Sequence, residues 1–90
     1  MEVEVRLPVS LGSFRGDGGT VVADGEDISG VIESLGMMFE GLKDELIDAR
    51  RQAWPNVRIF LNGEDIRYLN DLNTAVREGD VISIMPAVSG

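Results

Sequence analysis

The 90-residue sequence contains no cysteine and no histidine. The chain therefore has no disulfide, no thiol nucleophile, no imidazole base and no Cys/His zinc site. Basic residues are scarce as well, because 8 Lys and Arg stand against 16 Asp and Glu, giving a formal net charge of -8. No basic block exceeds the pair Arg50-Arg51. The clustered cations that bind nucleic acid phosphates are absent, so we expect no nucleic acid partner.

Long apolar runs are also missing. No segment reaches the ~18 consecutive apolar residues of a membrane span. Residues 1–5 alternate acidic and apolar side chains, whereas a secretory signal places basic residues before a continuous apolar run. We therefore expect a cytoplasmic protein that does not enter a membrane. Its excess of acids either keeps it soluble or attracts a basic protein partner.

The sequence does contain enough apolar residues for one small core. Hydrophobic residues make up 43% of the chain, which is too many for a disordered protein. No linker, repeat or low-complexity tract divides the sequence, so we predict a single domain over residues 1–90, with 86–90 as a flexible C-terminal tail. A domain of this size is expected to be stable by roughly 5–10 kcal/mol.

The first half predicts two strands and a helix. Apolar and charged side chains alternate over Glu2–Leu7, which is typical of a half-buried strand. A Gly-rich loop, Gly12–Gly19, leads to a second strand at Thr20–Ala23. Asp27 is suited to cap a helix that begins at Ile28. A short continuation of helix is predicted after Gly41. The helix carries one apolar stripe, formed by Ile28, Val31, Ile32, Leu35 and Met38 or Phe39.

The second half predicts three strands. The first is Asn56–Leu61, and Asn62-Gly63 after it is typical of a type I′ hairpin turn. A short strand at Asp65–Tyr68 follows. A compact connection with one turn of helix holds Leu69, Leu72 and Ala75, and a turn at residues 78–80 leads to the last strand. That strand is predicted at Val81–Met85, ended by Pro86.

This order of elements predicts an α+β fold. The helix stripe would cross one face of a mixed sheet of four to five strands, with the first and last strands adjacent and parallel in its middle. This is the β-grasp, or ubiquitin-like, arrangement. Met37 to Phe39 could form a Met/aromatic ligand cluster, but we interpret them as part of the core.

Few residues suggest a chemical site. Glu26-Asp27 and Glu64-Asp65 lie beside predicted turns and are interpreted as solvated acids. The segment 16–19 lacks the Lys and the following helix of a phosphate-binding loop, and 24–27 does not match a calcium loop. The C-terminus remains, because Ser89 and Gly90 would not obstruct a narrow channel, and the carboxylate of Gly90 has no neighbouring Cβ. A frayed terminus is the alternative.

Five segments form a recognisable pattern, namely residues 25–32, 62–67, 72–76, 78–86 and 87–90. Together they resemble the small sulfur carriers of the ubiquitin-like superfamily. These comprise the small subunit of molybdopterin synthase, the thiamine- and cysteine-biosynthesis carriers and, similarly, the archaeal ubiquitin-like modifiers. The resemblance covers the whole chain and is closest to the cysteine-biosynthesis type. The family tail ends in Gly-Gly, whereas this sequence ends in Ser89-Gly90.

The resemblance implies a carrier whose reactive group is its own C-terminus. A ubiquitin-activating-type adenylyltransferase would adenylate Gly90 with ATP, and a sulfur donor would displace AMP to leave a thiocarboxylate. A synthase subunit would accept the sulfur for molybdopterin, cysteine or thiamine. The protein would be no enzyme, would bind no metal or cofactor and would be a monomer when free. Two alternatives are a modifier joined through Gly90 to Lys of target proteins and a β-grasp interaction domain that is never activated.

The same fold predicts a surface for the partner. If Ile59, Ile82 and Ile84 face the helix, then Phe60 and Met85 point to the opposite face together with Arg58. An exposed Phe and Met there would form a partner-binding patch, unless loops cover them. The tail completes the predicted partner-binding set, with Pro86, Ala87, Val88 and Ser89.

Overall fold

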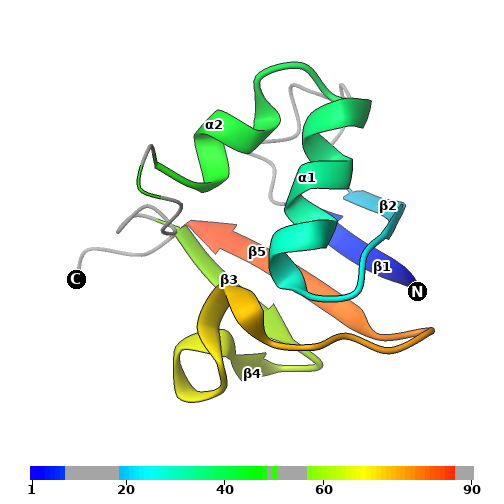
Figure 1. Ribbon diagram of the computed structural model, residues 1–90, viewed down its shortest axis with the longest axis vertical. Helices are drawn as coiled ribbons and strands as arrows, with labels where there is room; N and C mark the ends of the chain where they lie inside the picture. Colours follow the sequence, from blue (N-terminus) through cyan, green and yellow to red (C-terminus); the bar gives the residue numbers. More distant parts are fainter. Residues whose placement is uncertain (8–18, 49, 51–56, 87–90) are drawn as a thin grey trace.

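The computed structural model describes residues 1–7, 19–48, 50 and 57–86 of the protein, and their backbone forms a five-stranded mixed sheet with helices on one face (Figure 1). The strand order is β2-β1-β5-β3-β4. The predicted central pair is confirmed, because β1 and β5 run parallel with Val5 opposite Ile82. All other neighbours are antiparallel. The strands are β1 (Glu2–Leu7), β2 (Gly19–Asp24), β3 (Val57–Leu61), β4 (Glu64–Asp65) and β5 (Val81–Pro86).

Helix α1 (Ile28–Met38) crosses the sheet as its apolar stripe predicts (Figure 1). Asp27 is the N-cap, and its Oδ1 accepts a hydrogen bond from the Gly30 N–H at 2.7 Å. Helix α2 (Leu42–Leu46) is the predicted continuation after Gly41. The helices bury six side chains against the inner sheet face, namely Ile28, Val31, Ile32, Leu35, Leu42 and Leu46.

Alternate residues of the central strands face the helices and form the other half of the core. Val3 and Val5 of β1 meet Ile59 of β3 and Ile82 and Ile84 of β5, all at most 2% exposed. Phe39 packs partly buried against this cluster. The Asn62-Gly63 turn is confirmed, because both residues have positive φ, at 52° and 87°, as a type I′ turn requires. Among the described residues no helix is long and apolar enough to cross a membrane.

The prediction of a strand at Asp65–Tyr68 was wrong. Strand β4 ends at Asp65, and a 3₁₀ turn, η2 (Ile66–Tyr68), follows it. The Asp65 carboxylate accepts a hydrogen bond from the Arg67 backbone N–H at 2.9 Å. That N–H is thereby drawn into a cap and not into a strand ladder. A second 3₁₀ turn, η3 (Asp71–Asn73), supplies the predicted helical turn of the connection.

Two further details differ from the prediction. Met37 and Met38 are not core residues, because α1 ends there and their side chains are 89% and 49% exposed. Strand β5 runs one residue beyond Met85, since Pro86 pairs with Val57 at its end. Of the connection, Leu72 is buried, whereas Leu69 and Ala75 are exposed. The predicted loop over 12–18 and the strand start at Asn56 lie outside the described residues.

Gly25 allows α1 to pack tightly after β2. A Cβ at this position would lie 2.5 Å from the Val31 backbone N and 2.7 Å from the Val31 Cγ2. A Cβ at residue 25 would fit only if the backbone of α1 shifted away from it. Gly25→Ala is therefore expected to lower the free energy of unfolding by about 2 kcal/mol. Denaturant unfolding measures this change in the free energy of unfolding. The exposed neighbour provides the control, since Glu26→Ala should change stability by at most ~0.5 kcal/mol. Equal stabilities of the two variants would contradict the clash.

Candidate functional site

The predicted partner-binding side chains meet on the outer face of the sheet, opposite the helices. Arg58 and Phe60 of β3 alternate with the buried Ile59. Met85 of β5 lies directly opposite Arg58 in the antiparallel register. Since paired residues share a face, Arg58, Phe60 and Met85 form one surface, which we call the outer patch. Met85 is 49% exposed, Arg58 is exposed and Phe60 is half-buried.

The outer patch lies where β5 ends. Strand β5 finishes at Pro86, one residue after Met85, and points to the left in Figure 1. Ala87, Val88, Ser89 and Gly90 lie outside the described residues, as does the Pro86 side chain. Their predicted roles therefore stay predictions. The outer patch therefore lies beside the last described residue of the chain, Pro86.

A buried carboxylate supports one edge of the patch. Asp65 of β4 pairs with Phe60 and is only 6% exposed, which corrects the interpretation of Glu64-Asp65 as two solvated acids. Of these two acids, only Glu64 is exposed. Two guanidinium groups approach the Asp65 Oδ2, with the Arg67 Nη2 at 2.9 Å and the Arg58 Nε at 3.8 Å. The carboxylate therefore holds Arg67 by hydrogen bonds and lies close to Arg58 of the outer patch.

Arg67 donates hydrogen bonds to Asp65 from both its side chain and its backbone. The Nε donates to Oδ1 at 3.2 Å, and the backbone N–H donates to the same oxygen at 2.9 Å. These hydrogen bonds, the side-chain bonds first, lower the pKa of Asp65 below its ordinary 3.8, because they stabilise the charged form. The same contact raises the pKa of Arg67. The sequence signal is an Asp placed two residues before an Arg at a turn, which is the spacing of such a cap.

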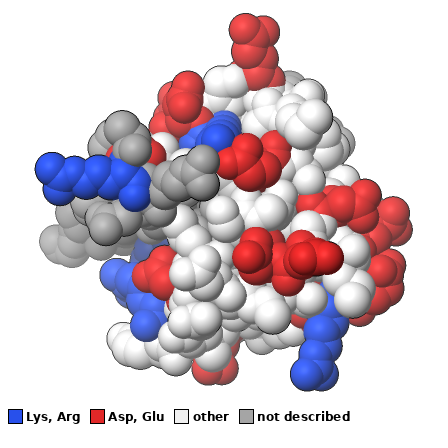
Figure 2. Space-filling model, in the orientation of Figure 1, with Lys and Arg blue, Asp and Glu red and all other residues white. Residues whose placement is uncertain are grey.

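Acidic side chains gather elsewhere on the molecule. Figure 2 shows them across the helical face and along its right-hand edge. Within the described residues, no group of three or more Asp, Glu, His or Cys side chains could hold a metal ion. No buried side-chain nitrogen or oxygen there lacks a hydrogen-bond partner. The described residues thus present the outer patch and an acidic surface, but no constellation for acid/base or metal chemistry.

Known proteins are similar to this chain over nearly its whole length. Residues 5–90 match the model of the ThiS family. The "Sulfur carrier protein CysO" of Mycobacterium tuberculosis is 34% identical over 92 residues, covering 100% of this chain and 99% of the relative. The "Small archaeal modifier protein 3" of Haloferax volcanii is 29% identical over the same shares. A chain in the crystal structure of the Amycolatopsis orientalis BexX/CysO complex superposes with a TM-score of 0.90, at 28% identity and 98% coverage of both chains.

Proposed function

The chain belongs to the ThiS family, and from this premise we propose that it is a sulfur carrier whose C-terminal Gly90 is converted to a thiocarboxylate. The end-to-end similarity to the sulfur carrier CysO is the observation that carries this proposal. The position of the outer patch, at the end of β5, supports it.

The proposed chemistry occurs in two steps at the carboxylate of Gly90. The carboxylate oxygen attacks the α-phosphorus of ATP, which forms an acyl adenylate and releases pyrophosphate. A sulfide sulfur then attacks the acyl carbon, and AMP leaves with the bonding electron pair. Adenylation is needed because a carboxylate is a poor electrophile without a good leaving group. ATP and the catalytic groups belong to an adenylyltransferase partner, and this cytoplasmic chain binds neither metal nor cofactor.

The fold contributes a rigid handle in this scheme. The outer patch would dock on the adenylyltransferase and then on the synthase subunit that takes the sulfur for cysteine, thiamine or molybdopterin. The solved BexX/CysO complex supports a role carried out in a complex with another protein. No base or nucleophile is required of this chain beyond its terminal carboxylate, which fits the absence of Cys and His.

The similarity to a small archaeal modifier favours a second candidate function. After the same adenylation, the amine of a target Lys would attack the acyl carbon in place of sulfide. An isopeptide bond would form and AMP would again leave. Both functions need Gly90 and the same activating partner.

Mass spectrometry of the protein purified from its native host tests the proposal. A C-terminal mass gain of about 16 Da is expected, because sulfur replaces one oxygen. Conjugates that leave a Gly90 remnant on Lys would instead support the modifier. Neither species, in cells that contain the adenylyltransferase, would contradict both functions and leave an interaction domain that is never activated.

Phe60→Ala tests the outer patch. We expect the variant to bind the adenylyltransferase at least about fivefold more weakly, because truncation of an interface aromatic typically costs more than 1 kcal/mol. Titration calorimetry measures the affinity, and circular dichroism checks the fold. Tyr68→Ala is the matched control, since Tyr68 is 80% exposed in η2 and lies outside the patch. Unchanged affinity of a folded Phe60→Ala variant would exclude Phe60 from the interface.

A further inference from the structure

Among the described residues, no strand pairs with the outer side of β2, which forms a second surface apart from the outer patch. β2 is the outermost strand of the sheet on the side of β1. Val22 lies opposite Glu4 of β1. The Glu4 N–H points away from β2, because it donates to the Asp80 carbonyl on the β5 side of β1. In an antiparallel ladder such a pair is not hydrogen-bonded. Val22 therefore directs its backbone N–H and C=O away from β1, and no described residue bonds to them.

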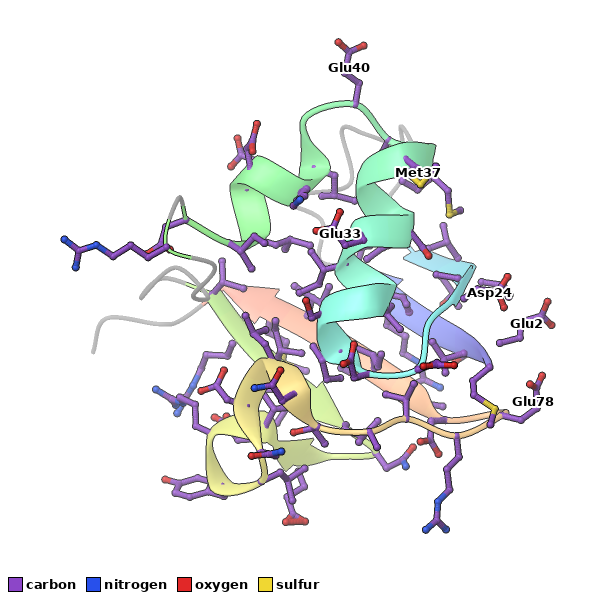
Figure 3. The ribbon with its side chains drawn as sticks, in the orientation of Figure 1. Glu2, Asp24, Glu33, Met37, Glu40 and Glu78 are labelled. Atoms are coloured by element: carbon purple, nitrogen blue, oxygen red, sulfur yellow. The ribbon has the colours of Figure 1, made fainter. Side chains whose placement is uncertain are left out.

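Helix α1 runs beside this edge and adds apolar surface to it. The Ser34 hydroxyl donates to the Asp24 carbonyl, which fixes the helix against the end of β2. Met37 and Met38 follow one turn later on α1, on the side of Ser34, because residues three and four apart share a helix face. Figure 3 shows Met37 above β2. Exposed apolar side chains flank the strand, namely Val22 (54%), Met37 (89%) and Met38 (49%).

The β2–α1 segment itself carries one sign of charge, whereas Arg6 of the neighbouring β1 lies opposite Thr20 and is paired with Glu4. Residues 19–42, which include β2 and α1, contain five acids and no Lys or Arg. Asp24, Glu2 and Glu78 follow one another along the same side of the molecule in Figure 3. In Figure 2 acidic side chains line the right-hand edge on this side, with basic atoms below them. A second copy of the chain is a poor occupant, because two copies would bring their acidic edges together.

We propose that the β2 edge binds an extended, basic peptide segment of a partner protein as an added antiparallel or parallel strand. The peptide backbone would bond to the N–H and C=O of Val22. Its apolar side chains would cover Met37, Met38 and Val22, and its Lys or Arg side chains would meet Asp24, Glu2 and Glu78, which lie along this side of the molecule (Figure 3). The outer patch would remain open, since Arg58 and Met85 belong to β3 and β5, so a basic partner could hold the carrier while its tail is processed.

A capped peptide of alternating Lys and Val provides the probe, titrated into the full chain at about 50 mM salt and followed by amide NMR. We expect shifts along β2 and the end of α1, and slower exchange of the Val22 amide. A Glu/Val peptide of the same length should bind at least about tenfold more weakly. Equal binding of the two peptides, or shifts centred on the outer patch, would overturn the proposal. Absence of binding at millimolar peptide would overturn it as well.

Variants separate strand addition from charge attraction. Val22→Pro removes the outward N–H and should weaken the Lys/Val peptide about tenfold or more, whereas Val22→Thr should stay within about twofold. If Val22→Pro does not fold, Met37→Lys serves instead, with at least about fivefold weaker binding. Tyr68→Lys is its matched control, because it adds the same charge to an exposed aromatic outside this edge. Equal effects of Met37→Lys and Tyr68→Lys would leave only general electrostatic attraction and reject the site.

Discussion

Removal of Gly90 is expected to reduce thiocarboxylate formation by more than about 100-fold. The deletion moves the terminal carboxylate back by one residue, which is about 3.5 Å of extended chain. Attack on the α-phosphorus of ATP needs the two reacting atoms about 3–3.5 Å apart, and a misplacement of 1 Å can cost about 100-fold. The new terminal residue, Ser89, also carries a Cβ next to the carboxylate, which a channel shaped for Gly would exclude.

Docking and chemistry should separate in this variant. Pyrophosphate release measures adenylation, and the shortened chain should show almost none. It should still compete with the intact chain for the adenylyltransferase, because Arg58, Phe60 and Met85 are unchanged on the outer patch. Near-normal adenylation without Gly90 would show that the reactive end is not this residue. Loss of competition would instead place much of the binding free energy in the tail.

The two faces of the molecule divide the proposed work. The outer patch combines the apolar Phe60 and Met85 with the cation of Arg58, whereas acidic side chains predominate on the helical face and along the side of β2. Partners of opposite chemistry could therefore recognise different sides of one small domain without competing for the same residues. The patch is continuous with the end of β5, so only its occupant would control the tail.

Local rules predict most of the backbone of this fold. The Asp27 cap, the Asn62-Gly63 turn and the alternation in β1 all form as expected, because each depends on neighbours within a few residues. The hairpin and the helix stripe then leave few ways to close a sheet. Pairing of β1 with β5 follows, since it buries Val5 and Ile82 on the helical side.

The departures arise where a side chain competes with the backbone or where distant elements decide exposure. Asp65 draws the Arg67 N–H out of a predicted strand, and no periodicity of apolar residues reveals that. Helix α1 ends at Met38, so Phe39 and not Met38 continues the stripe into the core. The exposure of Val22 follows from β2 being an edge strand, which depends on the order of the whole sheet.

Asp65→Ala is expected to lower the free energy of unfolding by about 2–3 kcal/mol at neutral pH. The change removes a nearly buried carboxylate that accepts charged hydrogen bonds from Arg67, and such bonds contribute about 1.5–3 kcal/mol. It also removes the cap of η2. Asp65→Asn should cost less, because an amide oxygen can still accept from the Arg67 backbone N–H. Glu64→Gln, on the exposed neighbour, is the matched control and should change stability by at most ~0.5 kcal/mol.

The pH dependence identifies the charge as the cause. Because the folded-state pKa of Asp65 is lowered below 3.8, its contribution is fully present above the unfolded pKa and is lost as pH falls through the folded pKa. The stability difference between the native chain and Asp65→Asn should therefore be constant near neutral pH and shrink as the pH falls below about 4. Urea unfolding at several pH values measures both proteins, and taking the difference cancels the other acids. A difference that stays constant down to the lowest pH would assign the role of Asp65 to packing and not to its ion pairs.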